Sequence, residues 1–328
     1  MTFTLRRTAT LIASVALFTT VGCGSDSSDS SESDSEPVGD ASAYPVTIDT
    51  SFGAVEIEEP PERVVTIGFS DQDFALALGV EPVGVREFLG YDAPNRPWAP
   101  KSVQGKEIPT VGAEELNVEK VASLDPDLIL GLNGYIDKAT YELLAEFAPT
   151  VAETDAGAPD WEEQTLLTGK ALGVEAEAKD LVQQTKQAFA DARDEHPEFE
   201  GKSAAFALGG AYALGTDDYR SGWLTDLGFT VPKTGGEVSE EELGTFDADV
   251  LIAEGVEEDV AESELFQSLD VVKQNRMVDV GEFSDDFAGA LGFNSPLSLP
   301  YVLEVAVPRL AAATDDDPST KPAPYPES

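Results

Sequence analysis

Histidine, cysteine and basic residues are scarce in this 328-residue sequence. It has one His, one Cys and 20 Lys+Arg against 63 Asp+Glu, which gives a net charge of −43 at pH 7. So few basic residues exclude a nucleic-acid-binding protein, which needs a basic face to displace phosphate counterions. A single His excludes most His-based zinc sites and hydrolases that use a His base, and a single Cys excludes an intrachain disulfide. The composition favours a binding protein.

The sequence also lacks the motifs of common active sites. It has no G-x-S-x-G, no P-loop and no G-x-G-x-x-G after a strand. His196 stands beside Pro197, where we expect exposure to solvent, not catalysis. We therefore predict that the protein is not an enzyme. A secreted enzyme is the alternative from outside this class, but no glycosidase-like carboxylate pair can be inferred, because 63 acids bring some carboxylates together by chance. A protein that binds a bare transition metal is disfavoured, since it would need several His.

The N-terminus has the features of an export signal. Arg6 and Arg7 precede a run of apolar and small residues that is too short to span a bilayer permanently. The lone Cys23 follows within Val-Gly-Cys-Gly, which resembles a bacterial lipobox. We predict that residues 1–22 are a lipoprotein signal peptide and that acyl chains on Cys23 anchor the chain to the extracytoplasmic face of the cell membrane. A plain signal peptide and export by the twin-arginine route remain alternatives.

Two segments have too few apolar side chains to fold. Residues 23–43 are rich in Ser and acids, so they cannot bury enough surface to offset the entropy of ordering. We predict a disordered tether there. The C-terminal residues 315–328 have a similar composition and are predicted to be a disordered tail.

The rest of the chain contains an internal repeat. Short apolar runs alternate with segments of helical period, as in βα units with parallel strands. Residues 119–131 align without gaps on residues 241–253, and each copy predicts a helix, an Asp-x-Asp turn and a buried strand. Residues 73–80 are similar to residues 222–229, and both predict a helix that ends at a glycine. The repeat therefore predicts two similar halves.

These halves are predicted to be an N-terminal lobe, residues 44–159, and a C-terminal lobe, residues 198–314. Between them, residues 160–197 are predicted to be helical. The part from 175 to 195 has no Gly or Pro and would be about 30 Å long, roughly one domain diameter. The predicted fold class is α/β, with two Rossmann-like lobes joined by a single long rigid helix. The alternative is that this helix covers one lobe only.

Five short segments support this arrangement by their order and spacing. They are Pro61-Glu-Arg-Val-Val, Ala77-Leu-Gly-Val-Glu-Pro-Val-Gly-Val85, Asn117-Val-Glu-Lys-Val-Ala-Ser-Leu-Asp-Pro-Asp-Leu-Ile-Leu130, Gly169-Lys-Ala-Leu-Gly173 and Phe246-Asp-Ala-Asp-Val-Leu-Ile252. Over residues 60–312 the sequence resembles the substrate-binding proteins of bacterial ABC importers for ferric siderophores, haem and cobalamin. The resemblance implies a ligand cleft between the lobes with limited closure, and an ABC permease with its ATPase as partners. We expect a monomer.

The ligand site is expected where the strands of both lobes end, because open α/β sheets bind ligands beyond the carboxyl ends of their strands. The loops at these ends carry many aromatic side chains, which suit a bulky organic chelate. Of the few arginines, Arg86, Arg96 and Arg220 remain after those assigned to strands and helices, and we favour one from each lobe as donors to anionic oxygens. A surface ion pair is the alternative for either arginine. The predicted ligand-binding residues are Arg86, Tyr91, Trp98, Tyr135, Tyr212, Arg220 and Phe283; Trp223 is predicted to be core.

The strong negative charge bears on the identity of the ligand. It would repel a trianionic ferric tricatecholate, so a ferric siderophore of the hydroxamate or mixed type is favoured. The siderophore would hold the iron, with no cofactor and no metal ligand from the protein. Haem and cobalamin remain alternatives, and a haem iron could take Tyr91, Tyr135, Tyr212 or Tyr219 as its axial ligand.

Relatives in the resembled family dock on their permease through an acid on each lobe. The repeat places Glu241 in this role on the C-terminal lobe. On the N-terminal lobe the matching helix begins at Asp137, which could instead cap that helix. Glu119 and Glu142 remain alternatives.

Overall fold

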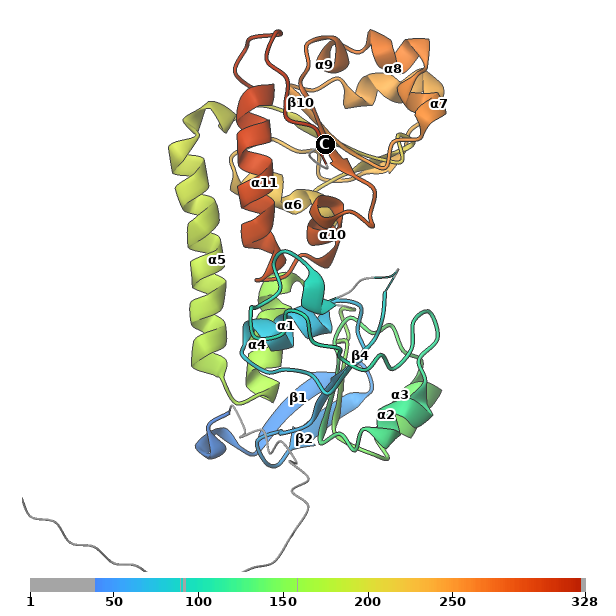
Figure 1. The fold of residues 1–328 in the computed structure, drawn as a ribbon, viewed down its shortest axis with the longest axis vertical. Helices are drawn as coiled ribbons and strands as arrows, with labels where there is room; N and C mark the ends of the chain where they lie inside the picture. The colour runs from blue at the N-terminus through green and yellow to red at the C-terminus, as the bar shows by residue number, and fades with distance from the viewer. Residues whose placement is uncertain (1–38, 89, 91–92, 158, 326–328) are drawn as a thin grey trace, which may run out of the picture. The chain divides into compact units, whose positions relative to one another are not determined.

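The computed structural model describes residues 39–88, 90, 93–157 and 159–325 (Figure 1). The predicted signal peptide, Cys23 and most of the predicted tether lie outside the described residues. Residues 39–43 of that tether are described, and they contain the short 3-10 helix η1 (Ala41–Ala43), which the carboxylate of Asp40 caps.

The N-terminal lobe is built on a parallel sheet. Its strand order over the described residues is β4-β3-β5-β6, and the antiparallel hairpin β1–β2 precedes it. The strands are β1 (Val46–Thr50), β2 (Gly53–Ile57), β3 (Val64–Thr66), β4 (Gly84–Val85), β5 (Leu128–Gly131) and β6 (Thr150–Ala152). The helices are α1 (Asp71–Ala77), η2 (Ala93–Asn95), α2 (Val118–Ser123) and α3 (Lys138–Leu144).

Both faces of this sheet are buried, which explains why its strands read as continuous apolar runs. Val64 and Leu128 pack on one face with residues of α1 and α4. Val65 and Ile129 pack on the other face with residues of α2 and α3. Successive residues of a strand point to opposite faces, so each short strand contributes to two cores.

The C-terminal lobe has a separate, mixed sheet. Over the described residues its strand order is β11-β10-β7-β8-β9, with β7, β10 and β11 parallel and β8 and β9 antiparallel. The strands are β7 (Ala204–Leu208), β8 (Tyr212–Leu214), β9 (Gly236–Glu237), β10 (Val250–Glu254) and β11 (Met277–Gly281). The helices are α6 (Tyr219–Asp226), η4 (Glu240–Phe246), α7 (Glu258–Ala261), α8 (Glu264–Ser268), α9 (Asp270–Lys273), α10 (Asp286–Phe293) and α11 (Ser298–Ala313).

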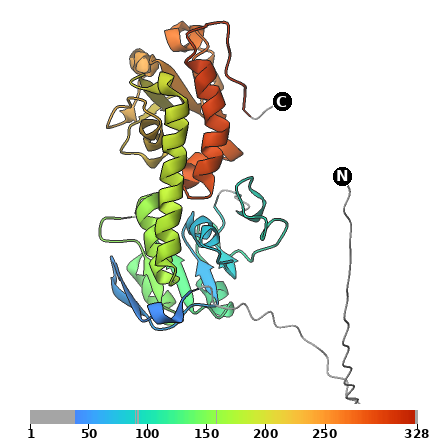
Figure 2. The ribbon, with the colours of Figure 1, turned by 90° about the vertical axis from the view of Figure 1, so that its left-hand side faces the viewer.

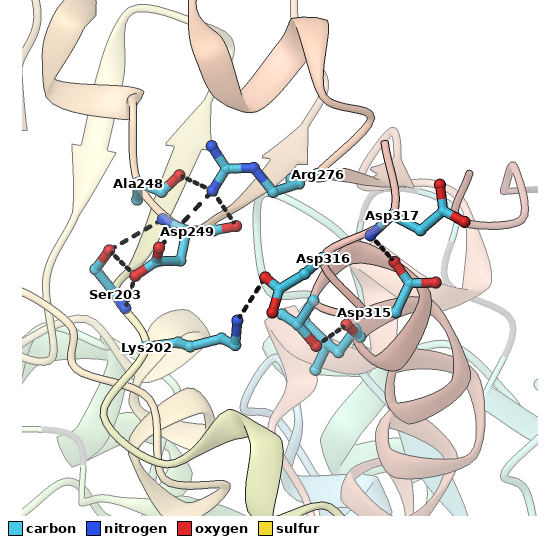
Figure 3. Close-up of polar contacts among 10 residues, drawn as sticks. Lys202, Ser203, Ala248, Asp249, Arg276, Asp315, Asp316 and Asp317 are labelled. Atoms are coloured by element: carbon cyan, nitrogen blue, oxygen red, sulfur yellow. Dashed lines mark hydrogen bonds and ion pairs between the residues drawn. The ribbon is translucent and has the colours of Figure 1, made fainter. Parts of the chain in front are cut away.

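The internal repeat is confirmed as helix, turn and strand in both lobes, α2–β5 and η4–β10. Asp127 accepts hydrogen bonds from the N–H groups of Glu62 and Arg63 at 2.8 and 2.9 Å, just before β3. Its counterpart Asp249 accepts from the N–H and Oγ–H of Ser203 at 2.8 and 2.7 Å, just before β7 (Figure 3). In each copy the aspartate ties the start of the repeat strand to the start of the neighbouring strand.

The second similarity is also confirmed. Helices α1 and α6 are followed by Gly79 and Gly228, whose φ angles are +83° and +98°. A glycine in this left-handed conformation ends a helix without the steric cost that a Cβ would bring.

Two helices follow β6 in the chain, and the second of them joins the lobes. Helix α4 (Trp161–Ala171) begins after Asp160, whose carboxylate accepts the N–H of Glu163 at 2.8 Å. Helix α5 (Glu175–Glu195) has the predicted bounds and precedes η3 (Pro197–Phe199). Ala178 lies in the core of the N-terminal lobe and Phe189 in the core of the C-terminal lobe, and α5 runs along both (Figure 2). The prediction of a bridging helix is confirmed.

The C-terminal segment differs from the prediction of a disordered tail. Arg309 of α11 donates from Nε and Nη2 to the carbonyls of Ala323 and Pro324 at 3.0 and 3.1 Å. The ring of Tyr325 lies 5.4 Å from that of Phe287. Composition suggested disorder, but these contacts bind the described part of the tail to α10 and α11.

Candidate functional site

Five aromatic rings form a chain of contacts from one lobe to the other. Phe69 lies 4.3 Å from Phe88 and 6.2 Å from Tyr135 between ring centroids. Phe88 in turn lies 5.7 Å from Phe283 and 6.2 Å from Phe293, both of the C-terminal lobe. We call these five residues the aromatic belt. Phe69, Phe88, Tyr135 and Phe283 follow β3, β4, β5 and β11, so the belt lies at the strand ends where α/β proteins bind ligands.

Arg86 lies against the belt at Phe69 and is 8% exposed. Its guanidinium stacks 4.3 Å from the ring of Phe69. Four N–H groups donate to the backbone carbonyls of Ala113, Ile67, Gly134 and Glu114 at 2.7–3.4 Å. It forms no ion pair within the described part of the chain. The N–H groups of Arg86 that were expected to donate to the ligand therefore donate largely to backbone carbonyls. No carboxylate of the described residues forms an ion pair with the guanidinium.

Arg220, the predicted arginine of the other lobe, is surrounded by acids. Its Nε and Nη2 donate to the carboxylate of Asp218 at 3.3 and 3.4 Å, and Nη1 lies 3.7 Å from Oε1 of Glu254. Glu254 ends β10 and is 2% exposed. Burial raises the pKa of Glu254 to about 7; Arg220 opposes the rise, and Asp218 and Glu282 add to it. We call Arg220, Asp218, Glu254 and Glu282 the Arg220 cluster.

The Arg220 cluster lies close to the aromatic belt. Burial raises the pKa of Tyr219, whose ring lies 5.7 Å from the Arg220 guanidinium, and the charges of both Tyr135 and Glu254 contribute to this rise. Tyr135 and Tyr219 come from different lobes and are 65% and 53% exposed. Tyr135 belongs to the belt and Tyr219 contacts Arg220, so the charge interaction of these two phenols relates the belt to the Arg220 cluster.

The prediction that Trp98 lines a pocket is wrong. It is 8% exposed and belongs to the core of the C-terminal lobe, 5.4 Å from the ring of Tyr301. Its Nε1–H donates to the buried carboxylate of Asp73 at 3.0 Å, and the Oγ–H of Ser295 donates to the same oxygen at 2.9 Å. Trp98 is buried because the loop that carries it packs on the C-terminal lobe. Trp223, predicted to be core, is 4% exposed.

Three further predicted residues are exposed on the surface. Tyr212 on β8 is 44% exposed and has no ring contact with the belt. Asp137 caps α3 by accepting the N–H of Thr140 at 2.8 Å, the second of the two roles left open for it, and its side chain stays exposed. Glu241 is exposed on η4. Tyr91 and Cys23 lie outside the described residues.

The sequence analysis did not single out Phe69, Glu254 or the buried acids of α1. Glu254 carried a signal, because it is a charged residue that directly continues the apolar run Val-Leu-Ile-Ala of a buried strand. Phe69 directly follows Gly68 in the loop after β3. Asp71 and Asp73 are each 1% exposed, and nothing in their spacing distinguishes them from the many surface acids.

A pocket of about 270 Å³ at the opposite edge of the C-terminal sheet carries charges of both signs (Figure 3). Lys202 lies 3.3 Å from Asp316, and Arg276 lies 3.8 Å from Asp249 and donates to the carbonyl of Ala248 at 3.0 Å. Both of its cations are therefore paired with acids, and it lies by the amino ends of β7 and β10, away from the belt.

Neither a metal centre nor a membrane span is found in the described ranges. No three His, Cys, Asp or Glu side chains among residues 39–88, 90, 93–157 and 159–325 are grouped so that they could bind a metal ion. Within the same residues, no helix has the length and apolar character needed to cross a bilayer.

Comparison with known proteins agrees with this architecture. Residues 65–282 match the sequence profile of the periplasmic binding protein family. The probable siderophore-binding lipoprotein YfiY of Bacillus subtilis is 30% identical over 211 residues, which cover 58% of this chain and 62% of YfiY. A periplasmic solute binding protein of Mycobacterium smegmatis is 32% identical with a TM-score of 0.73, covering 82% of this chain and 98% of that one. PiaA of Streptococcus pneumoniae, solved in complex with ferrichrome, is 26% identical with a TM-score of 0.66, covering 83% and 99%.

The chain belongs to the periplasmic binding protein family. The family prediction and the predicted two-lobed α/β fold are both confirmed. The family consists of substrate-binding proteins. The belt and the two arginines are therefore the candidate substrate-binding residues.

Proposed function

We propose that this chain is the substrate-binding lipoprotein of an iron-siderophore ABC importer. It binds a ferric siderophore of the hydroxamate or mixed type between its lobes, as a monomer, and delivers the chelate to the permease. The observation that carries this proposal is the aromatic belt, which has rings from both lobes and contacts, at Phe69, the guanidinium of Arg86, which has no carboxylate partner among the described residues. A ferric hydroxamate presents apolar ligand arms around a polar, oxygen-rich iron centre, and a site with aromatic walls and few polar anchors fits both features.

The relatives support the same ligand class. YfiY is named as a probable siderophore-binding lipoprotein, and PiaA was solved with ferrichrome, a neutral ferric trihydroxamate. The stacking of Arg86 on Phe69 keeps the guanidinium charge at the belt, where it would attract the oxygens that bind the iron. The iron is cargo held by the chelate, so the protein supplies no metal ligand.

Titration of the purified chain, followed by intrinsic tryptophan fluorescence, tests this proposal. We expect ferrichrome to bind one site per chain with a dissociation constant in the micromolar range or below, and a ferric tricatecholate to bind at least ten times more weakly. Hemin and cyanocobalamin serve as competing ligands. A Soret band on addition of hemin, together with no response to ferric hydroxamates, would contradict the proposal and favour haem.

We also propose that Cys23 is lipidated and that Asp137 and Glu241 contact the permease. Cys23→Ser should move the chain from the membrane fraction to the soluble fraction of cells.

Asp137→Lys and Glu241→Lys should reduce uptake of the chelate by cells while leaving its binding in solution unchanged. Because Asp137 also caps α3, a thermal melt should accompany the first of these variants.

A further inference from the structure

Glu254 is an unusual carboxylate because it is buried and incompletely bonded. It is 2% exposed, and its Oε2 has no hydrogen-bond partner among the described residues. Within the described part of the chain, its one ion-pair contact is the 3.7 Å approach of Arg220 Nη1 to Oε1. A buried carboxylate oxygen without a donor destabilises a protein, so such a group calls for an explanation beyond packing.

Arg220 does not need Glu254 as its counterion. The guanidinium already donates twice to Asp218, at 3.3 and 3.4 Å. Glu282 is close enough to raise the pKa of Glu254 further. The cluster therefore sets three carboxyl groups against one arginine, an excess of negative charge at the carboxyl ends of β10 and β11.

Charges of both signs lie beside the belt. On the N-terminal lobe, Arg86 is buried against Phe69 and forms no ion pair with a carboxylate of the described ranges. On the C-terminal lobe, the Arg220 guanidinium lies 5.7 Å from the ring of Tyr219. Burial raises the pKa of Tyr219, and the charge of Tyr135 in the belt adds to this rise. A ligand in contact with Phe69 and Tyr135 would meet the positive charge of Arg86 and the negative charge of the Arg220 cluster.

We propose that Glu254 is a specificity-determining residue that binds a cationic group of the siderophore, such as a protonated primary amine. The amine would donate to the unpartnered Oε2, while the oxygens around the iron face Arg86. This inference rests on the proposed function and narrows its ligand class to ferric hydroxamates that carry a free ammonium group. Because the carboxylate is already buried, the attraction is only weakly screened by water and salt.

A matched pair of chelates tests the inference. Ferrioxamine B is a linear ferric trihydroxamate that ends in a primary ammonium group, and its N-acetyl derivative has the same iron centre without that charge. We expect the chain to bind ferrioxamine B at least ten times more tightly than the acetylated chelate at pH 8. Glu254→Gln should bring this ratio to within threefold of one while leaving the affinity for the acetylated chelate within twofold. Glu258→Gln, an exposed acid of α7 with the same change in charge, should keep the ratio.

The possible results separate this inference from the proposed function. If both chelates bind and the ratio is near one, or if Glu254→Gln leaves the ratio unchanged, the inference is wrong and siderophore binding stands. If neither ferrioxamine binds but ferrichrome does, only the inference is wrong; if ferrichrome also fails to bind, the proposed function fails and the inference falls with it.

A second measurement on the unaltered chain covers the case in which Glu254→Gln does not fold. The groups facing Glu254 are Arg220, Asp218, Tyr219 and Glu282. Since burial raises the pKa of Glu254 to about 7, it loses its charge as the pH falls below neutral. The preference for ferrioxamine B should decline at least threefold between pH 8 and pH 5.5. A constant preference over this range would overturn the inference.

Discussion

At the scale of single residues, the buried acids show how differently the same side chain behaves inside this strongly acidic protein. Asp71 is 1% exposed and accepts the N–H of Gly68 at 3.0 Å and the Nε2–H of Gln164 at 2.6 Å. It therefore ties the loop after β3 to α4. Burial raises the pKa of Asp71 to about 7, and its hydrogen bonds oppose this rise.

This raised pKa predicts a stability effect with a definite sign. The folded chain holds the proton of Asp71 up to about pH 7, whereas the unfolded chain releases it near pH 4. The folded state thus binds more protons between these values, and the contribution of Asp71 to the free energy of unfolding falls as the pH rises from about 4 to 7. Chemical denaturation of wild type and Asp71→Asn at pH 4.5 and pH 8 measures the effect. The stability of wild type relative to Asp71→Asn should fall by on the order of 2–4 kcal/mol; an unchanged difference would show that Asp71 ionises normally.

Tyr135 offers a test of the belt with little effect on folding, because its side chain is 65% exposed. Tyr135→Ala should weaken siderophore binding by about 1–2 kcal/mol, or roughly 5- to 30-fold, through loss of an aromatic contact surface. Tyr212→Ala is the matched control, since Tyr212 is also exposed but has no ring contact with the belt. Fluorescence titration compares the two; equal losses for both variants would argue against the belt as the ligand site.

At this scale, the sequence predicted which residues lie near the strand ends better than it predicted which groups surround each side chain. It placed Arg86 and Phe283 correctly beside other strand-end residues, and Trp223 in the core. It failed for Trp98, because whether a loop tryptophan faces solvent depends on the lobe against which the loop packs. It also did not anticipate that Arg86 would give four N–H groups to backbone carbonyls, since these come from loops distant in sequence.

At the scale of elements, α5 is the feature that the sequence defined best. A segment without Gly or Pro, ended by residues that stop helices, fixes both bounds and length locally. By contrast, the packing of the C-terminal segment depends on long-range contacts of Tyr325 and Arg309, so its composition alone suggested disorder. The antiparallel strands β8 and β9 were likewise not predicted, because they are only three and two residues long.

Phe189 fixes the end of α5 to the C-terminal lobe, where it is 4% exposed. Phe189→Ala should lower the free energy of unfolding by about 3–5 kcal/mol, because it leaves a cavity between the helix and the lobe. Gln184→Ala, on the exposed side of the same helix, should change it by less than about 0.5 kcal/mol. Urea denaturation followed by circular dichroism measures both; a small effect of Phe189→Ala would mean that the helix is not firmly attached to this lobe.

At the scale of the whole molecule, a net charge of −43 acts on any charged ligand before contact. A trianionic ferric tricatecholate should associate more slowly than neutral ferrichrome at low ionic strength, because the protein repels it. Raising NaCl from about 10 to 300 mM shortens the Debye length from about 30 Å to below 10 Å and should speed association of the trianion several-fold. The rate for ferrichrome should change by less than twofold. Stopped-flow fluorescence measures both rates, and equal salt responses would show that net charge does not select the ligand.

The internal repeat in the sequence predicted the two-lobed fold. The aromatic belt forms only where the two lobes meet, because Phe88 of one lobe contacts Phe283 and Phe293 of the other. Hydrogen–deuterium exchange with and without ferrichrome tests this joint site most directly. The account predicts slower exchange on both lobes, in residues 67–70 and 132–136 of one and 217–220 and 281–285 of the other. Protection confined to one lobe, or found instead around Lys202 and Arg276, would contradict it.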